Sequence, residues 1–361
     1  MTNFTRRHFV LGAAGLAGAA VLTACGGDEP TPADPTQPGT TDPGTPETTP
    51  ADETSPAVEE TSEAPQTVDP IKVGYIADAN GTTLITVAEH LGLWEKHGLD
   101  AETISFTNGP LQIQALGTGD LDFGYIGFGA LWLPMTGQAK VVAIQSRGLA
   151  DRVIAQPGLT SIEDLRGKRV GVPEGTSGDI LLGLALEKAG MSVSDIERLA
   201  MDAPTAISAF SSGQIDGAGI WHPHVATIQQ QVPDLVEVAK SADFADLAFL
   251  ACQVAAPSIT ERPEILKKYQ AVAKEALTWA SENQEELTQL LSDAIDVPVE
   301  SLSNELEHVQ MYSAQEVIDL DADGSIEGFL RGLNQVFVDQ EKTPEVVDPA
   351  TYWLSQEYAD A

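Results

Sequence analysis

The feature that most constrains this chain is a regular alternation of short β-branched runs with helical patterns, beginning at Ile71. Strand-like runs lie at 71–76, 101–106, 121–126 and 141–145, and helical spacings lie between them at 83–97, 110–117 and 130–137. Strands that alternate with helices in this way usually pair in parallel, because each helix returns the chain to the same edge of the sheet. We therefore predict a doubly wound, parallel α/β sheet.

The same pattern starts again further along the chain. Strand-like runs are found at 169–172, 197–201, 217–221 and 235–238, with helical spacings at 179–189 and 204–212. After an apolar stretch at 247–255, long amphipathic spacings follow at 265–291 and 325–340. Two similar α/β units indicate two lobes, followed by a largely helical C-terminal part.

The N-terminus has the composition of an export signal. Arg6 and Arg7 precede an apolar, Ala/Gly-rich run at 12–22, which is too short to span a bilayer. The following Leu-Thr-Ala-Cys sequence resembles a bacterial lipobox, which predicts that Cys25 is acylated and that residues 1–25 form a twin-arginine-type lipoprotein signal. The alternative is a plain cleaved signal with a chance cysteine.

Residues 26–69 consist mainly of Pro, Thr, Ala and acidic residues and contain no Lys or Arg. Such a composition leaves almost nothing to bury, so we expect an extended, disordered tether. The folded part then begins near Pro70. The formal net charge of −35 opposes binding to nucleic acid. Cys252 lies in an apolar run and is expected to be a core residue without a disulfide partner.

Three stretches of the chain resemble, in order and spacing, the solute-binding proteins of ABC importers for taurine, aliphatic sulfonates and nitrate. They are EHLGLWEKHGLDAETISFTNGPLQIQALGTGDLDFGYIG, LTSIEDLRGKRVGVPEGTSGDILLGLALEKAG and AFSSGQIDGAGIWHPHV. The resemblance covers about residues 71–240 and implies a type II periplasmic-binding-protein fold, with two lobes, a hinge and a cleft. Residues 70–148 and 247–361 would form lobe one, and residues 149–246 would form lobe two.

The resemblance also implies a function. We expect an exported, membrane-anchored lipoprotein that binds a small anionic or zwitterionic solute between its lobes and delivers it to an ABC permease as a monomer without a cofactor. Nitrate and a pyrimidine precursor of thiamine are alternative ligands. Two other roles stay open: a sensory lipoprotein, and an enzyme like the pyrimidine-precursor synthases, in which His222 would be consumed.

Ligands of open α/β sheets bind at the carboxyl ends of strands, where helix N-termini offer free N–H groups to an anion. The candidate ligand-binding residues at these joins are Asp78, Asn80, Asn108, Gly127, Phe128, Glu174, Thr176 and Ser177. Several of them also have the residue types of ordinary helix caps, so capping is the competing interpretation.

Charged residues near the cleft leave the charge of the ligand open. Arg147 follows a predicted strand and has the forked geometry that suits an oxyanion, although a surface ion pair is an alternative. Asp78 and Glu174 would suit an ammonium group. In taurine-binding members an aspartate stands at the position of His222, so its absence here favours an unaminated sulfonate, another anion or a heteroaromatic ligand.

The sequence Gly-Ile-Trp-His-Pro-His-Val at 219–225 contains the last candidates. Trp221 is expected to form an apolar wall of the pocket, and His222 to offer a donor or a pH-dependent charge. Pro223 would end the strand, which places His224 in the next helix. A zinc site would need further ligands at recognisable spacing, and no third His or Cys follows these two histidines within reach in the sequence.

A different motif resembles half of a calcium loop. Asp319, Asp321 and Asp323 occupy the first, third and fifth positions of an EF-hand pattern, and Gly324 occupies the sixth. The twelfth position is Leu330, where the bidentate glutamate should be. A calcium site is one interpretation, and an acidic turn that ends in glycine is the other.

Overall fold

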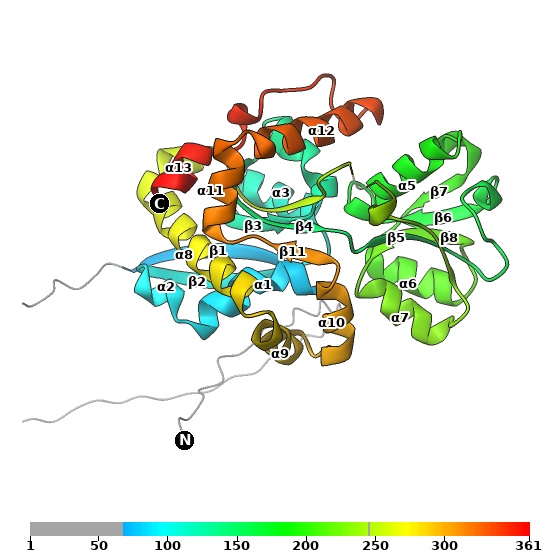
Figure 1. The fold of residues 1–361 in the computed structure, drawn as a ribbon, viewed down its shortest axis with the longest axis horizontal. Coiled ribbons are helices and arrows are strands. Elements are labelled where there is room, and N and C mark those ends of the chain that lie inside the picture. Colours follow the sequence, from blue (N-terminus) through cyan, green and yellow to red (C-terminus); the bar gives the residue numbers. More distant parts are fainter. Residues whose placement is uncertain (1–67, 245) are drawn as a thin grey trace, which may run out of the picture. The chain divides into compact units, whose positions relative to one another are not determined.

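The computed structural model describes residues 68–244 and 246–361 (Figure 1). The predicted export signal, the acylation site Cys25 and nearly all of the predicted tether lie outside the described residues. Within the described residues, no helix is both long enough and apolar enough to cross a membrane.

The first sheet has six strands, in the order β11-β4-β10-β3-β1-β2. Their bounds are β1 (Asp69–Ile76), β2 (Leu99–Phe106), β3 (Phe123–Ile126), β4 (Lys140–Gly148), β10 (Leu250–Ala255) and β11 (Val309–Met311). β1 pairs in parallel with β2 and β3. We call the elements around this sheet, 69–148 and 250–361, the first lobe.

The second sheet has five strands, in the order β7-β6-β8-β5-β9. Their bounds are β5 (Asp151–Ala155), β6 (Arg169–Val172), β7 (Glu197–Ala200), β8 (Gly217–Trp221) and β9 (Val236–Lys240). β6 pairs in parallel with β7 and β8. Residues 151–240 are called the second lobe.

The predicted parallel pairing holds for β1 with β2 and β3 and for β6 with β7 and β8, but each sheet also contains antiparallel pairs. β10 runs antiparallel to both β3 and β4, and β5 runs antiparallel to both β8 and β9. The cause is the double crossing between lobes: the chain leaves the first sheet at Gly148 and returns to it beside that point. Gly148 N donates to Phe249 O at 2.9 Å, so the two crossings lie side by side as a hinge.

The helices of the first lobe are as follows: α1 (Ala79–His90), α2 (Leu93–Lys96), α3 (Gly109–Thr118), α4 (Trp132–Met135), α8 (Pro263–Glu282), α9 (Gln284–Ile295), α10 (Val299–Leu306), α11 (Ala314–Ala322), α12 (Ser325–Asp339) and α13 (Ser355–Asp360). Those of the second lobe are α5 (Ser177–Lys188), α6 (Ala203–Ser211) and α7 (His224–Gln231). Six short 3-10 segments are η1 (Phe128–Ala130), η2 (Glu163–Leu165), η3 (Val193–Asp195), η4 (Ser241–Phe244), η5 (Pro257–Glu261) and η6 (Pro349–Thr351).

Three predicted helices are divided in the structure. The helix expected over 83–97 breaks at Gly92, whose φ of 63° is in the left-handed region that glycine adopts without strain. The spacing at 265–291 breaks at Asn283, and the one at 130–137 becomes η1 followed by α4. Short breaks of this kind leave the hydrophobic period intact, so periodicity alone does not reveal them.

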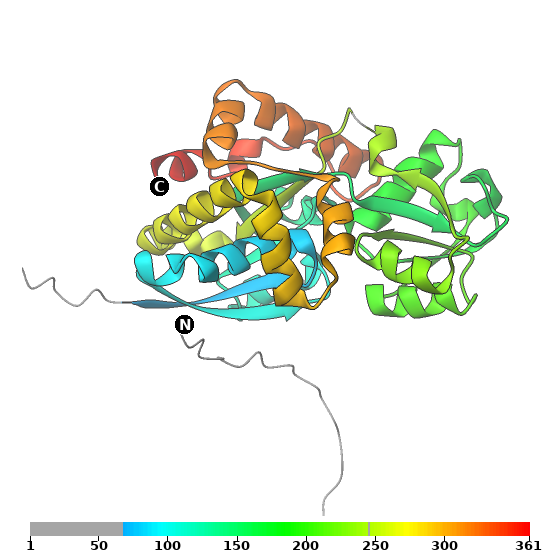
Figure 2. The same cartoon turned by 60° about the horizontal axis from the view of Figure 1, so that its bottom comes forward.

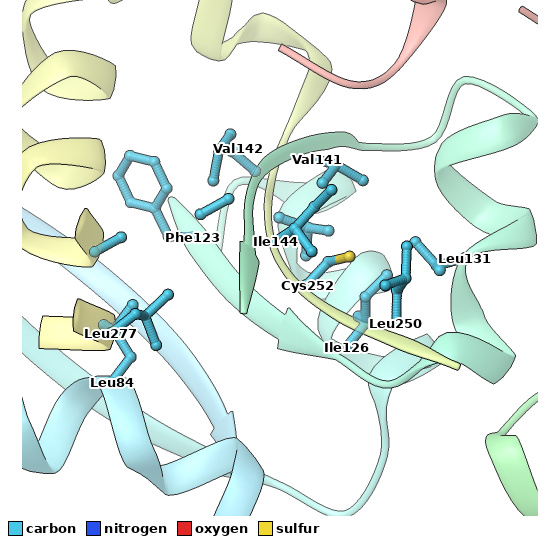
Figure 3. Packing of buried hydrophobic residues seen from close by; sticks show 14 of the residues in the cluster. Leu84, Phe123, Ile126, Leu131, Val141, Val142, Ile144, Leu250, Cys252 and Leu277 are labelled. Carbon is cyan, nitrogen blue, oxygen red and sulfur yellow. The ribbon is translucent and has the colours of Figure 1, made fainter. Parts of the chain in front are cut away.

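The core of the first lobe lies between its sheet and the C-terminal helices. α8 and α9, drawn in yellow, lie beside α1 in both ribbon views (Figures 1 and 2). The rings of Phe123 and Tyr269 stack at 3.7 Å between centroids. Cys252 is fully buried on β10 and forms no disulfide, as predicted, and lies near Ile126 and Leu250 (Figure 3).

The second lobe has one apolar cluster on each face of its sheet. One includes Val170, Leu181 and Leu186, which come from β6 and α5. The other includes Phe210 and Ile228, which come from α6 and α7. The faces are therefore both covered by helices, as a doubly wound sheet requires.

Candidate functional site

A cleft lies where the strand ends of both sheets meet the hinge. It encloses about 660 Å³, with the open solvent at its mouth included. Its walls come from the ends of β1, β3, β6 and β8, the two crossings, and the C-terminal helix α10. The cleft therefore stands at the place where ligands of open α/β sheets bind.

Nine of the eleven predicted ligand-binding residues line this cleft. They are Asp78, Asn80, Asn108, Gly127, Phe128, Thr176, Ser177, Trp221 and His222. The structure brings them together from five different strand-to-helix joins. Their contact with a ligand stays a prediction.

Capping and cleft position are not exclusive at these joins. Asp78 caps α1 by accepting from Gly81 N at 2.7 Å, and Asn108 caps α3 by accepting from Leu111 N at 3.0 Å. Thr176 differs, because its hydroxyl donates to Pro173 O at 2.6 Å and makes no cap bond to α5. The capping interpretation thus holds for Asp78 and Asn108 and fails for the Thr176 side chain.

Direct contacts join the two lobes across the cleft. Trp221, at the end of β8, donates its indole N–H to Asp78 Oδ2 at 3.1 Å. Gly129 lies against the backbone at the start of α5: a Cβ there would be 2.1 Å from Thr176 C and 2.2 Å from Ser177 N. The described conformation is therefore closed around these residues.

Three buried carboxyl groups line the cleft: Asp78, Asp151 and Glu305. Burial raises the pKa of Asp78 from 3.8 to about 6, against the lowering effect of hydrogen bonds from Gly81 and Trp221. Burial also raises the pKa of Asp151 to about 6, while the Ser177 hydroxyl lowers it.

Glu305 is the most deeply buried of the three carboxyl groups. Burial, followed by the charge of Asp78, raises the pKa of Glu305 well above its usual value. Its Oε1 accepts from Ala79 N at 3.3 Å. Mutual repulsion and desolvation therefore make this part of the cleft unfavourable for three simultaneous negative charges.

Aromatic rings form the apolar part of the cleft. Phe128 and Phe249 lie with centroids 4.3 Å apart, and Tyr125 and Trp221 complete the wall. Burial raises the pKa of the Tyr125 hydroxyl well above 10, so this group stays a neutral phenol. The site combines a flat aromatic wall with carboxylic acids.

His222 and His224 carry no charge at neutral pH. Burial lowers the pKa of His222 to about 4, and the charge of Arg152 lowers it further in the same direction. Burial likewise lowers the pKa of His224 to about 4. His224 lies in the first turn of α7, as predicted, with its ring 5.1 Å from that of Trp221. His222 therefore offers the cleft a neutral imidazole.

Arg147 and Glu174 do not line the cleft, contrary to prediction. Arg147 Nη2 donates to Leu247 O at 3.1 Å, and its guanidinium lies 5.9 Å from the Phe329 ring centroid. Glu174 is an exposed partner of Arg198 at 3.4 Å and lines a second pocket, which shares Asn108 and Pro110 with the cleft. Both residues follow predicted strands, but neither is part of the lining of the cleft.

The calcium interpretation of the acidic motif is wrong. Asp319 and Asp321 lie on helix α11, where consecutive ligand positions cannot converge as in a loop, and Asp321 accepts from the Trp353 indole at 2.8 Å. Asp323 Oδ1 accepts from Ser325 N at 2.9 Å at the start of α12. Across the described residues, no three His, Cys, Asp or Glu side chains are grouped to hold a metal ion.

Sequence reasoning missed several cleft residues, among them the titratable groups Tyr125, Asp151 and Glu305. Tyr125 lies inside β3, one residue before its last residue, whereas the rule for open sheets points to the residues that follow a strand. Asp151 follows the first crossing directly, so recognition of the hinge would have indicated it. Glu305 carries no local signal, because it occupies an amphipathic helix whose other acidic residues are exposed.

Residues 80–287 match the model of a family described as NMT1/THI5-like. The chain belongs to this family. A putative binding protein of Brucella abortus is 49% identical over 288 residues, which cover 79% of this chain and 90% of that protein. A putative aliphatic sulfonates-binding protein of Bacillus subtilis is 27% identical over 227 residues, 60% of this chain and 67% of that protein.

Solved structures show the same fold. The periplasmic aliphatic sulphonate binding protein SsuA from Escherichia coli superposes with a TM-score of 0.61 at 20% identity, over 81% of this chain and all of that one. A desulfurization enzyme, DszB, superposes with a TM-score of 0.60 at 15% identity, over 81% and 98% of the two chains. The predicted type II periplasmic-binding-protein fold is confirmed, and this fold serves both binding and catalysis.

Proposed function

We propose that this chain is the extracytoplasmic solute-binding component of an ABC importer, and that it captures a small solute by closure of its two lobes. The observation that carries this proposal is the cleft at the hinge, with the Trp221 indole of one lobe bonded to the Asp78 carboxyl of the other at 3.1 Å. A solute held there would be enclosed by both lobes and released when they separate.

Closure provides selectivity through contacts that exist only in the closed form. The backbone at the start of α5 lies directly against Gly129, with no side chain between them. In this closed form, a solute in the cleft would contact both lobes at once. A solute shifts the lobes toward closure only by the contacts it gains there. The closed form then docks on the permease, which delivers the solute across the membrane.

Sulfonate- or taurine-like solutes are the first candidates for the ligand, because the Bacillus subtilis relative and the Escherichia coli structure are named for aliphatic sulfonates. The start of α5 lies at the cleft and would offer backbone N–H groups to a sulfonate. Nitrate and thiamine-precursor pyrimidines are the alternative ligands, and a screen that contains all of these classes distinguishes them.

The N-terminal part of the proposal concerns membrane attachment. Acylated Cys25 would hold the protein at the outer face of the cell membrane, and residues 26–69 would give the folded lobes reach toward the permease. We propose a monomer, because one chain supplies both walls of the cleft. Mass spectrometry of the purified protein tests this part by detecting diacylglycerol on Cys25.

Binding is favoured over catalysis by the names of the sequence relatives, which are binding proteins. The fold alone does not decide, since DszB shares it. For the synthase alternative, His222 would be consumed during turnover. Intact mass before and after incubation tests that alternative, and an unchanged mass contradicts it.

A screen of the purified full chain tests solute capture. Sulfonates, taurine, nitrate, carboxylates and pyrimidines are tested for a rise in melting temperature and for a fall in the radius of gyration by X-ray scattering. At least one class is expected to give both effects, because closure buries the solute and compacts the lobes. No effect from any class would contradict the proposal.

A further inference from the structure

The charge of the cleft points to a class of ligand. Three carboxyl groups, those of Asp78, Asp151 and Glu305, line one cavity, and among the described residues no lysine or arginine lines it with them. The acids come from three separate places in the chain: the start of α1, the start of β5 and helix α10. This concentration of negative groups is unfavourable for a solute that carries only negative charge.

The arginine whose charge acts on Asp151, Arg152, makes its hydrogen bonds elsewhere. Arg152 directs Nε to Glu237 Oε2 at 3.0 Å and Nη1 to the backbone oxygens of Leu149 and Asp151, each at 2.8 Å. Its charge lowers the pKa of Asp151 without a hydrogen bond to that carboxylate. The neutral Trp221 indole donates to Asp78, and the hydroxyls of Ser177 and Ser241 donate to Asp151. Tyr125, a neutral phenol, and His222, a neutral imidazole, line the same cavity.

Glu305 supplies the second observation. Its side chain is 2% exposed, its Oε1 accepts a weak bond from Ala79 N, and its Oε2 is buried without a hydrogen-bond partner among the described residues. A buried, unpartnered carboxyl oxygen in a ligand cleft is costly unless a donor reaches it. A ligand N–H group is such a donor.

The surroundings favour an organic donor over a metal ion. The described His, Cys, Asp and Glu side chains contain no cluster of three that fits a metal. The rings of Tyr125, Phe128, Trp221 and Phe249 line the same cavity, and aromatic faces attract cationic nitrogen groups as well as apolar carbon. Carboxylates and aromatic walls together match a nitrogen cation on a carbon skeleton.

We propose that Asp78, Asp151 and Glu305 form a subsite for a positively charged N–H group, so that the solute is an organic cation or a zwitterion and not a plain anion. This inference rests on the proposed capture of a solute in this cleft. It narrows the sequence prediction of a small anionic or zwitterionic solute, because carboxyl groups from three different elements line the cavity. Glu305 lies outside residues 80–287, the segment that matches the family model.

Two matched probe pairs test the subsite with the purified full chain and isothermal calorimetry. Taurine and isethionate differ only in an ammonium against a hydroxyl group, and benzamidine and benzamide differ in a cationic amidine against a neutral amide. We expect the nitrogen cation of at least one pair to bind at least tenfold tighter than its partner. Taurine binding indicates a zwitterion, and benzamidine binding indicates a cation.

The pH dependence of the affinity gives an independent test of the charge of the solute. Below about pH 6 the carboxyl groups of Asp78 and Asp151 take up protons, so affinity for a cationic group falls, by about tenfold per pH unit for each proton taken up. An anion shows the opposite slope, because protonation removes repulsion. A steady or rising affinity between pH 7.5 and 5 therefore contradicts the subsite.

Variants assign the effect to Glu305. Glu305→Gln keeps the size of the side chain and is expected to weaken binding of the cationic probe at least tenfold, while the melting temperature without ligand stays equal or rises. The control is Glu307→Gln, an exposed residue of the same segment, which is expected to leave the affinity unchanged. An unchanged affinity of Glu305→Gln refutes its role.

Native mass spectrometry distinguishes a failure of the cation subsite from a failure of solute capture. The full chain is incubated with yeast extract and desalted, and any retained solute is identified. A solute with a basic nitrogen supports the subsite, and a retained solute without one refutes it while leaving capture intact. If neither the extract nor the probes yield a bound solute, both capture and the subsite are refuted.

Discussion

Gly129 offers a direct test of closure, because the close approach of the two lobes depends on its missing side chain. A Cβ at this position would lie 2.1 Å from Thr176 C and 2.3 Å from Thr176 O. Ordinary contact begins near 3.4 Å, so the start of α5 must retreat by about 1.3 Å in Gly129→Ala. The same movement would stretch the 3.1 Å Trp221–Asp78 hydrogen bond beyond bonding distance.

The size of the effect follows from the cost of overpacking. Forcing an extra methyl group into a packed contact costs about 1–3 kcal/mol, and here the cost falls on the closed form alone. The dissociation constant of any captured solute should therefore rise by about 5- to 140-fold. The unfolding free energy should change little, because the lobes avoid the clash by opening.

The assay compares Gly129→Ala with Gly117→Ala. The control lies in α3, is exposed and outside the lining of the cleft, and has open space where its Cβ would be. X-ray scattering without ligand should show a larger radius of gyration for Gly129→Ala only. An unchanged radius together with an unchanged dissociation constant would refute the role of this contact in closure.

Three further predictions concern other parts of the fold. Asp78→Asn should raise the unfolding free energy at pH 8 by about 2 kcal/mol in ligand-free protein, from about 3 kcal/mol for the buried charge less about 1 for a lost hydrogen bond. The pKa of Asp78 is raised in the folded protein, so this gain in unfolding free energy should vanish below pH 4, where the carboxyl group is neutral in both the folded and the unfolded state. Urea titrations at both pH values measure the difference. Asp179→Asn should cost about 2–3 kcal/mol, since the buried carboxylate binds Arg198 at 2.8 and 2.9 Å, whereas Glu174→Gln, the exposed partner of the same arginine, should cost less than about 0.5 kcal/mol. Cys252 should react with a thiol reagent only as fast as the protein unfolds, and prompt reaction in the native state would contradict its burial on β10.

Much of the architecture could be predicted from the sequence, because the burial of one face gives each helix or strand a hydrophobic period. The strand at 217–221 agrees with β8 residue for residue, and the helices expected at 179–189 and 325–340 differ from α5 and α12 by at most two residues at either end. Strand direction was not accessible. The antiparallel course of β10 depends on where the chain returns from the second lobe, which no local pattern records.

The cleft was predictable where a residue follows a strand, and unpredictable where it does not. Asp78 and Trp221 sit at strand ends, so the rule for open sheets located them. Glu305 reaches the cleft from a C-terminal helix, and its neighbours in sequence are ordinary amphipathic residues. Arg147 follows the predicted strand 141–145 but lies within β4, and its guanidinium bonds to Leu247 on the returning crossing, which only tertiary structure reveals.

The acids of the cleft link the charge of the ligand to the movement of the lobes. Asp78 and Glu305 belong to the first lobe and Asp151 to the start of the second, so closure brings like charges together and removes water from them. Without a ligand this cost favours open lobes; a nitrogen cation between the carboxylates reverses its sign. The same three side chains would thereby select the solute and make closure depend on it, which explains why a protein would keep carboxyl groups that lower the stability of its empty closed form.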